Sequence, residues 1–324
     1  MNERTRARFA AIARPQPGCR IAVAIPARDE TATIDATLAA FSRQRTLDGR
    51  VLDPRRFELL IFANACSDDT AERARAFARA HPHLALHVLA ERDGEPPTIG
   101  VARGTVMDAA AERMARRDGG LVATTDADSV VADDWIAANL HELRDVDAVG
   151  GRVIPATFRE ADGLDHRYRF AIVRLESMLA PQAHDPWPRH GNHQGASLAM
   201  RTAAYARAGG VPAVRVLEDF GLVDALLATG ATLRHSLRVR VVTSTRREGR
   251  AYGGFATHMH DLDEHVAGRR PYLVEHPADT IARIIASSPG IARPLVPIDA
   301  AIGSLEGYAR TLEASAARPA RINA

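Results

Sequence analysis

In the segment IAVAIPARDETATIDATLAAFSRQ, residues 21–44, the pattern of apolar residues changes from a continuous run to helical spacing. Ile21–Ile25 is a short, continuous apolar run that ends at Pro26, a pattern typical of a buried strand. Thr31–Gln44 then carries apolar side chains at helical spacing. The segment therefore predicts a strand, a short charged turn and a helix.

The same alternation continues through roughly the first 150 residues. Strands are expected at Phe57–Ala63, Leu84–Leu89, Leu121–Thr125 and Ala148–Ile154, and helices at Asp69–Ala80, Val101–Arg116 and Asp133–Leu143. Strands that alternate with helices predict an α/β, Rossmann-like fold with a mostly parallel central sheet flanked by helices. In such sheets, ligands bind at the carboxyl ends of the strands.

After roughly residue 150, strands and helices alternate less regularly. We expect a helix at His166–Leu179, a strand at Gly195–Arg201, a helix at Glu218–Thr229, a strand at Arg238–Thr243 and a helix within Pro294–Ala324. The last of these could touch a membrane, but packing on the domain is the preferred interpretation. The expected divisions within one continuous domain are an N-terminal extension (1–20), a regular α/β half (21–155), a less regular half (156–265) and C-terminal helices (266–324).

The sequence contains no lysine, so all 42 of its lysine-plus-arginine residues are arginines. With 40 acidic residues the net charge is +2, which gives no reason to expect a nucleic-acid partner. A phosphate-binding or catalytic lysine is excluded. Anion recognition must therefore come from arginine, backbone N–H groups or a metal ion.

The two cysteines, Cys19 and Cys66, are far apart and form no CxxC pattern. A zinc site or a disulfide framework is therefore not expected, and a reducing cytoplasm fits. No run approaches the roughly 18 apolar residues of a spanning helix, and the first residues lack the apolar stretch of a secretory signal. We expect a cytoplasmic protein without an integral span, for which peripheral membrane contact stays open.

Two carboxylates, Asp126 and Asp128, follow the expected strand at Leu121–Thr125. On an extended chain, residues i and i+2 point the same way, so both side chains can reach one ligand. Such hard oxygen donors suit Mg²⁺ or Mn²⁺, which completes its shell with water and phosphate oxygens. The alternative is an Asx-turn or a helix cap.

Two further polar turns follow expected strands. The turn Pro26-Ala27-Arg28-Asp29-Glu30 offers carboxylates for a base or ribose and an arginine for a phosphate, with a helix cap by Asp29 as the alternative. The turn that begins at Asn64 offers amide and carboxylate groups suited to a nucleobase edge, and Ser67 or Asp68 can also cap the next helix. The three turns should meet at one edge of the sheet.

The order of VAIPARDE, FANACSDDT, TTDADS, GASLAMR and LEDF, over roughly residues 20–260, resembles glycosyltransferase family 2 with its GT-A fold. The family usually has an aspartate before the asparagine of the second motif, where this chain has Ala63. That departure leaves recognition of the base to Asp29, Glu30 or Asn64.

The resemblance implies a nucleotide-diphospho-sugar donor such as a UDP- or GDP-sugar, a hydroxyl acceptor and inversion at the sugar carbon. It also implies Mn²⁺ or Mg²⁺ on Asp128, with Asp126 as a further ligand or a ribose contact. By similarity to the family's Glu-Asp motif, Asp219 is the general base and Glu218 its neighbour. The alternative for the pair is that both residues simply favour a helix N-terminus.

Three other positions belong to the expected donor site. Gly195 and Ser197 are small enough to let the backbone approach donor and acceptor, and tight packing is their alternative. Arg103 lies near the start of an expected helix and could face the donor, or be a solvated arginine.

Late in the chain, Arg246, Arg247 and Arg250 could clamp a diphosphate, with a solvated basic loop as the alternative. His258 is a candidate third protein ligand of the metal, although an isolated histidine is more often structural.

Other functions remain open at this level. A retaining GT-A transferase would share these motifs, and so would a domain that binds a nucleotide sugar without turnover. A sugar nucleotidyltransferase is disfavoured, because the turn at 26–30 lacks glycine and the chain lacks a catalytic lysine. The sequence identifies neither the donor sugar nor the acceptor, which can be a metabolite, a saccharide or a lipid head group.

Overall fold

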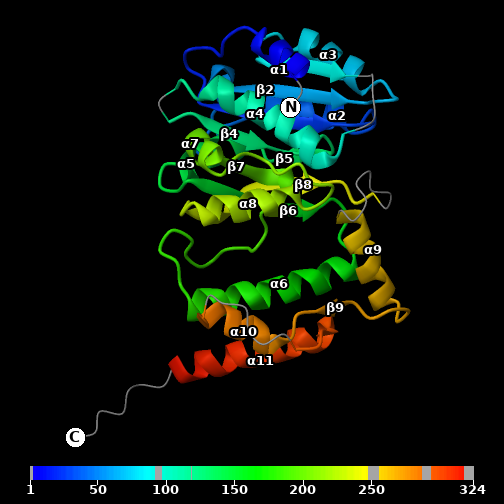
Figure 1. The fold of residues 1–324 in the computed structure, drawn as a ribbon, viewed down its shortest axis with the longest axis vertical. Coiled ribbons are helices and arrows are strands. Elements are labelled where there is room, and N and C mark those ends of the chain that lie inside the picture. The colour runs from blue at the N-terminus through cyan, green and yellow to red at the C-terminus, as the bar shows by residue number, and fades with distance from the viewer. Residues whose placement is uncertain (1–2, 92–96, 118, 247–254, 287–292, 317–324) are drawn as a thin grey trace, which may run out of the picture. The chain divides into compact units, whose positions relative to one another are not determined.

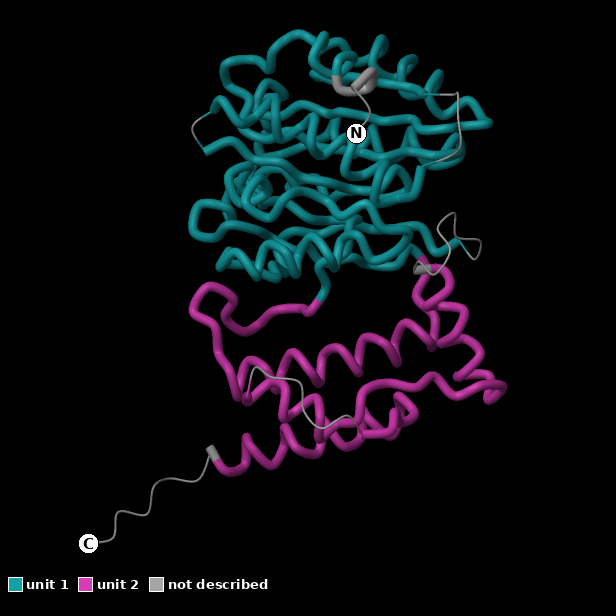
Figure 2. The backbone as a smooth tube through the Cα atoms, viewed as in Figure 1, with its two compact units in different colours: residues 1–156, 192–254 teal, residues 157–191, 255–324 magenta. Residues whose placement is uncertain are grey.

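The structure is a computed structural model that describes residues 3–91, 97–117, 119–246, 255–286 and 293–316 (Figure 1). Its contacts divide the chain into two compact units (Figure 2). Unit 1 comprises residues 1–156 and 192–254, and unit 2 comprises residues 157–191 and 255–324. The functional divisions expected at residues 20, 155 and 265 stay predictions.

Unit 1 contains an eight-stranded sheet with the order β3-β2-β1-β4-β7-β6-β8-β5. The strands are β1 (Ile21–Ala27), β2 (Phe57–Asn64), β3 (Leu86–Glu91), β4 (Leu121–Thr124), β5 (Ser129–Val131), β6 (Ala148–Pro155), β7 (Leu198–Arg201) and β8 (Leu233–Thr243). The first four strands of this order are parallel, as is the pair β6–β8, while β7 and β5 run antiparallel to their neighbours. The expected mostly parallel α/β sheet is confirmed.

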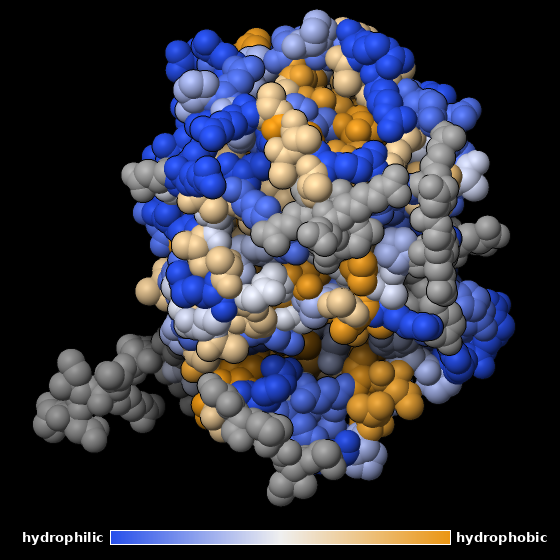
Figure 3. All heavy atoms as spheres, turned by 45° about the horizontal axis from the view of Figure 1, so that its top comes forward, coloured by the Kyte–Doolittle hydropathy of each residue, from blue (hydrophilic) through white to orange (hydrophobic). Residues whose placement is uncertain are grey.

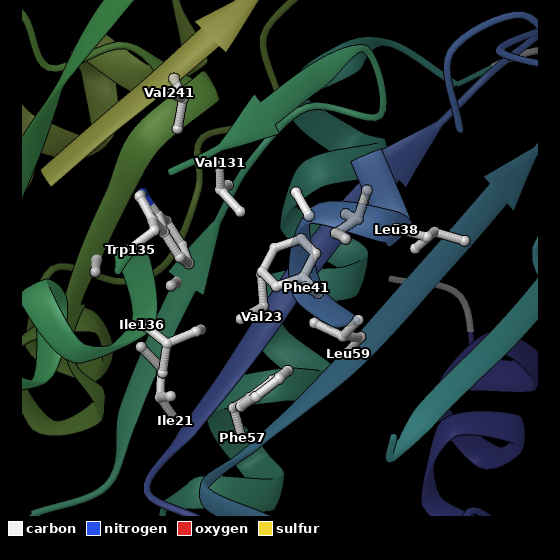
Figure 4. Packing of buried hydrophobic residues seen from close by; sticks show 14 of the residues in the cluster. Ile21, Val23, Leu38, Phe41, Phe57, Leu59, Val131, Trp135, Ile136 and Val241 are labelled. Carbon is white, nitrogen blue, oxygen red and sulfur yellow. The ribbon is translucent and has the colours of Figure 1, made fainter. Parts of the chain in front are cut away.

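Alternate residues of the central strands pack on opposite faces of the sheet. In β1, Ile21, Val23 and Ile25 join one apolar cluster, whereas Ala22 and Ala24 join the other. Figure 4 shows the first cluster, in which side chains from the strands meet aromatic side chains of the covering helices. The continuous apolar runs in the sequence arise because both faces are buried.

Helices cover both faces of the sheet. The first cluster includes residues of α2 (Ile34–Ser42), α3 (Thr70–Ala80) and α5 (Trp135–Glu142). The second includes residues of α1 (Glu3–Ala10), α4 (Ile99–Met114), α7 (Thr202–Arg207) and α8 (Glu218–Ala228). A short 3₁₀ turn, Pro54–Arg56, precedes β2.

Two expectations about strands need correction, and one strand of the large sheet was not expected. Residues 195–197 form a 3₁₀ turn rather than the start of a strand, because the Gly195 N–H and C=O bond to side chains and not to a neighbouring strand. Strand β8 begins at Leu233, earlier than expected, and pairs with β6 across a register shift between Gly151 and Arg152. The short strand β5 was not expected, and it pairs with the end of β8.

Unit 2 is built from α6 (Glu160–Leu179), α9 (Phe255–Val266), α10 (Pro277–Ala286), α11 (Ile298–Ala316) and the two-stranded ribbon of β9 (Leu273–Val274) and β10 (Val296–Pro297). Helix α6 starts before the expected His166, where the Arg159 N–H donates to Asp162 Oδ2 at 2.7 Å. Helix α11 buries Ile302 and Leu305 against α6 and its neighbours, so the expectation that the C-terminal segment packs within the fold is confirmed.

The face shown in Figure 3 mixes hydrophilic regions with smaller hydrophobic patches. Among the described helices, none combines the length and the apolar character that crossing a membrane requires.

Candidate active site

The carboxyl ends of β1, β2 and β4 lie at one edge of the sheet, because these three strands are parallel neighbours. Hydrogen bonds tie the polar turns after them to the surrounding elements. Asn64 Nδ2 donates to the Ala27 carbonyl at 3.1 Å, and Thr37 Oγ1 donates to the Ala127 carbonyl at 3.0 Å. The expected convergence of the three turns is confirmed.

The first two turns are bonded to each other through acidic side chains. Asp29 Oδ1 accepts from the N–H of Ser67 at 2.7 Å, and Asp68 Oδ2 accepts from the N–H of Thr31 at 3.0 Å. Burial alone would raise the pKa of Asp68, but hydrogen bonds, first those with Thr31, lower it to about 2. Asp29 therefore joins two turns and does not cap α2, whose N-cap residue is Thr33.

Asp126 and Asp128 lie at different depths after β4. Asp126 is partly exposed, and its Oδ1 accepts from Arg103 Nη2 at 2.8 Å. Asp128 is more deeply buried. Burial first, and then the negative charge of Asp126, raise the pKa of Asp128 to about 7. A carboxylate in such surroundings gains stability from a nearby cation.

Arg246 follows β8 and supplies a cation to this edge. Its Nη1 lies 3.1 Å from Asp128 Oδ2 and 2.8 Å from each carboxylate oxygen of Glu30. A cavity of about 480 Å³ opens beside these groups. The cavity is lined by polar and apolar residues from α2, β5, β6 and β8 and their flanking turns: Thr33, Asp128, Val130, Ala156, Val242, Thr243, Ser244, Thr245 and Arg246. The other two expected arginines, Arg247 and Arg250, lie outside the described residues.

Arg103 of α4 is only 3% exposed and bonds to several parts of this edge. Its four acceptors are Glu218 Oε1 (3.0 Å), Thr124 Oγ1 (2.9 Å), Asp126 Oδ1 (2.8 Å) and the Gly195 carbonyl (3.1 Å). Burial alone would lower the pKa of Arg103, but the charges of Asp126 and Glu218 raise it above its ordinary value. Arg103 thus joins the turn after β4 to the start of α8.

The space beside Gly195 is filled by Arg103. A Cβ atom at position 195 would lie 2.5 Å from Arg103 Cζ, closer than real Cβ contacts. The N–H of Gly195 donates to Asp219 Oδ2 at 2.7 Å. Tight packing therefore accounts for this glycine, and its approach to a ligand stays a prediction.

Glu218 and Asp219 begin α8 after a strained residue. Leu217 has φ +59°, a left-handed conformation that leucine rarely adopts. The two side chains then have different partners. Glu218 is buried against Arg103, whereas Asp219 is partly exposed and accepts from two backbone N–H groups, those of Gly195 and Phe220. The pair therefore separates a buried structural carboxylate from an accessible one.

The remaining expected donor contacts occupy varied positions. Ser197 is buried and its Oγ accepts from Trp135 Nε1 at 3.0 Å, so its hydroxyl takes part in packing. Pro26 and Ala27 form the buried end of β1. Arg28 is partly exposed, with Nε 3.8 Å from an Asp29 carboxylate oxygen.

His258 belongs to unit 2. Its Nδ1 lies 2.9 Å from Tyr272 Oη and its Nε2 lies 3.1 Å from Asp165 Oδ1. Both ring nitrogens therefore have partners within unit 2, and the role of His258 as a metal ligand stays a prediction.

A sequence comparison decides the family. The family described as "Glycosyltransferase like family 2" matches residues 17–213, more than half of the chain. The chain belongs to this glycosyltransferase family. No curated protein matches it in sequence.

A solved mannosyltransferase has a similar fold. A mannosyltransferase from Pyrobaculum calidifontis, PcManGT, in complex with GDP-Man and Mn²⁺, is 17% identical with a TM-score of 0.51, over 96% of this chain and 85% of that one. The Staphylococcus aureus protein TarS (1–349) with UDP-GlcNAc is 15% identical with a TM-score of 0.49, over 91% of this chain and 73% of that one. The likeness to PcManGT supports the GT-A fold.

The turn after β4 carries side chains that suit the divalent-ion site that this glycosyltransferase fold implies. Its donors are carboxylate oxygens, the ligands that Mg²⁺ and Mn²⁺ prefer. The guanidinium of Arg246 also stands in for a cation there, because three carboxylate oxygens surround one of its nitrogens. Asp128 would hold the ion, with Asp126 beside it.

Within the described residues, one group of three possible ligands has its ligand atoms within 4.8 Å of one another: Asp29, Cys66 and Asp68. It fits a metal ion less well. Burial raises the pKa of the Cys66 thiol, and a protonated thiol is a poor ligand. Both carboxylates are already engaged in joining the two turns.

The residues that sequence reasoning missed are those whose role depends on a distant partner. Thr124, which binds Arg103, is an ordinary strand residue in sequence. Thr33, Val130 and Thr243 line the cavity from three separate segments. No local pattern marks them, because the sheet order alone brings their segments together.

Proposed function

We propose that this glycosyltransferase moves a sugar from a nucleotide-diphospho-sugar to an acceptor hydroxyl, with a divalent ion and with inversion at the sugar carbon. The observation that carries the proposal is the link through Arg103, which bonds both to Asp126 and to Glu218. Because one buried side chain joins these two acidic motifs, Asp126 and Asp128, which are proposed to bind the sugar donor, are held at the same edge as the candidate base Asp219. The GDP-Man and Mn²⁺ of PcManGT support the classes of donor and ion.

Asp219 is the proposed general base. Two backbone N–H groups orient its carboxylate, which stays partly exposed. In the transfer, Asp219 takes the proton of the acceptor hydroxyl while that oxygen forms a bond to the anomeric carbon. The bond from that carbon to the diphosphate oxygen breaks, and the nucleoside diphosphate leaves with the electron pair.

The leaving group is highly charged, so its stabilisation matters. A divalent ion on Asp128 would supply electrostatic stabilisation of the diphosphate when bound. Arg246 lies at the same edge and would contact a phosphate oxygen once its present partners release it. We infer that Asn64 and the turn residues 26–29 contact the nucleoside.

The test separates donor binding from transfer. We would screen UDP- and GDP-sugars for Mn²⁺-dependent hydrolysis and measure nucleoside diphosphate binding by calorimetry. Asp128→Ala should abolish metal-dependent binding. Asp219→Asn should leave binding intact and lower transfer by about 10²-fold or more. Near-normal turnover in Asp219→Asn would refute this base, and a product that retains the anomeric configuration would refute inversion.

A further inference from the structure

One nitrogen of Arg246 has three carboxylate oxygens around it. Nη1 lies 2.8 Å from both oxygens of Glu30 and 3.1 Å from Oδ2 of Asp128. The two carboxylates come from turns after different strands, β1 and β4. Their oxygens therefore converge on a single point that a cation occupies.

The two carboxylates are fixed more firmly than the cation. Glu30 is 6% exposed, its Oε2 accepts from Thr33 Oγ1 at 2.8 Å, and its N–H donates to Thr70 Oγ1 at 2.7 Å. The Arg246 side chain is 33% exposed and follows the last residue of β8 by three positions. The arginine can leave by side-chain rotation, whereas burial and the bond from Thr33 hold the Glu30 carboxylate in place.

We propose that Glu30 is a second carboxylate of the metal site, and that Arg246 fills this site as an internal cation until the divalent ion displaces it. The inference rests on the proposed function. Two carboxylates at one point suit a small divalent ion with oxygen ligands. The guanidinium and the ion exclude each other, because both are positive and need the same oxygens.

The displaced arginine has a new partner available. A donor brings a diphosphate with the ion, and a guanidinium binds phosphate oxygens with charge-assisted hydrogen bonds. Exchange of Arg246 from carboxylates to diphosphate would couple metal entry to donor entry. Arg246 therefore opposes metal binding in the absence of donor and favours it in the presence of donor.

The experiment measures Mn²⁺ binding to the full chain directly, from the electron paramagnetic resonance signal of free Mn²⁺, with and without UDP or GDP. Without nucleotide, Arg246→Gln should bind Mn²⁺ about fivefold more tightly than the wild type, the factor expected of a partly exposed ion pair. Glu30→Gln should bind it about tenfold or more weakly, because one carboxylate ligand is lost. With UDP or GDP present, the advantage of Arg246→Gln should disappear or reverse.

Arg240 provides a matched control. It lies on β8, its side chain is 40% exposed, and it pairs with Asp134 at 3.0 Å. Arg240→Gln should leave Mn²⁺ affinity unchanged, which excludes a general effect of net charge. Arg246→Lys keeps the positive charge and should stay near the wild type, so a loss of packing is distinguished from a loss of charge.

The inference would be overturned if Arg246→Gln bound Mn²⁺ equally or more weakly without nucleotide, since Arg246 would then support the site. Unchanged affinity in Glu30→Gln would remove Glu30 from the site. Either result can occur while the wild type still transfers sugar with Mn²⁺, so the proposed function would stand. A wild type that transfers sugar without any metal would refute the metal dependence itself.

Discussion

Two arginines at the same edge of the sheet bridge acidic turns in different ways. Arg103 comes from a helix, is 3% exposed and has four protein acceptors. Arg246 follows a strand, keeps a side chain that is 33% exposed and contacts two carboxylates. The same guanidinium–carboxylate interaction is therefore a fixed structural link at Arg103, called the brace below, and an exchangeable contact at Arg246.

The difference follows from burial. A charge pair removed from water is expensive to break, because the partner left behind has no solvent to stabilise it. A partly exposed pair loses little when it separates, because water replaces each partner. In a transferase, the first kind of contact can position catalytic groups and the second can make way for a ligand. Four experiments test this contrast.

The largest effect is expected from removing the buried brace. Arg103→Met should lower the free energy of unfolding by about 3–5 kcal/mol, because it leaves the buried carboxylate of Glu218 and that of Asp126 without their common partner. Chemical denaturation measures this loss. A loss below about 1 kcal/mol would show that Arg103 is no more important for stability than a surface arginine.

The second experiment crowds the same arginine without removing it. Gly195→Ala places a Cβ 2.5 Å from Arg103 Cζ and should lower the free energy of unfolding by about 1–3 kcal/mol. Transfer should fall as well, because the Gly195 N–H orients Asp219. Gly303→Ala is the matched control: this glycine lies in α11 with nothing within 4 Å of its added Cβ, so stability should stay equal or rise slightly. Equal stability in both variants would contradict the crowding.

The third experiment uses pH. Burial raises the pKa of Asp128 to about 7, above its ordinary value of 3.8. The folded state therefore holds a proton that the unfolded state releases, so this carboxylate increasingly destabilises the fold as pH rises from about 4 to 7. With metal chelated, Asp128→Asn should melt at a higher temperature than the wild type at pH 8 and at a similar temperature at pH 4. An equal difference at both pH values would show that ionisation of Asp128 does not cost stability.

The smallest effect is expected from the exchangeable arginine. Arg246→Met should lower the free energy of unfolding by about 1 kcal/mol, less than Arg103→Met, because water reaches the 33% exposed Arg246 side chain although Glu30 and Asp128 themselves are largely buried. Denaturation under the conditions used for Arg103→Met gives a direct comparison. A loss as large as that of Arg103→Met would mean that Arg246 is a second brace, and would argue against its displacement by a metal ion.

Much of the first half of the fold was predictable from local pattern. β1, α3 and the turn that holds Asp126 and Asp128 follow from short apolar runs, helical spacing and polar punctuation. Their boundaries shift by a few residues because caps and strand ends depend on side-chain bonds such as those of Asp68. The short strand β5 escaped prediction, because three residues form a strand only when β8 lies beside them.

The sequence located the candidate carboxylates on the chain but not their partners, and their roles at the site stay predictions. Asp128 and Asp219 lie where the motifs placed them. Arg103 is buried among protein acceptors, so it is not a solvated arginine, and its role toward the donor stays a prediction. The Ser197 hydroxyl bonds to Trp135, and its place near a ligand stays a prediction as well. A sequence shows which groups are present, whereas their partners depend on residues far along the chain.

The sequence by itself determined the α/β alternation, the acidic turns at strand ends and the reliance on arginine, because hydrophobic period and side-chain chemistry are local properties. Only the tertiary structure decided that Arg103 became a brace and Arg246 an exchangeable cation. Both are arginines near acidic motifs in the sequence. Burial separates them, and burial is set by which strands and helices pack around each side chain.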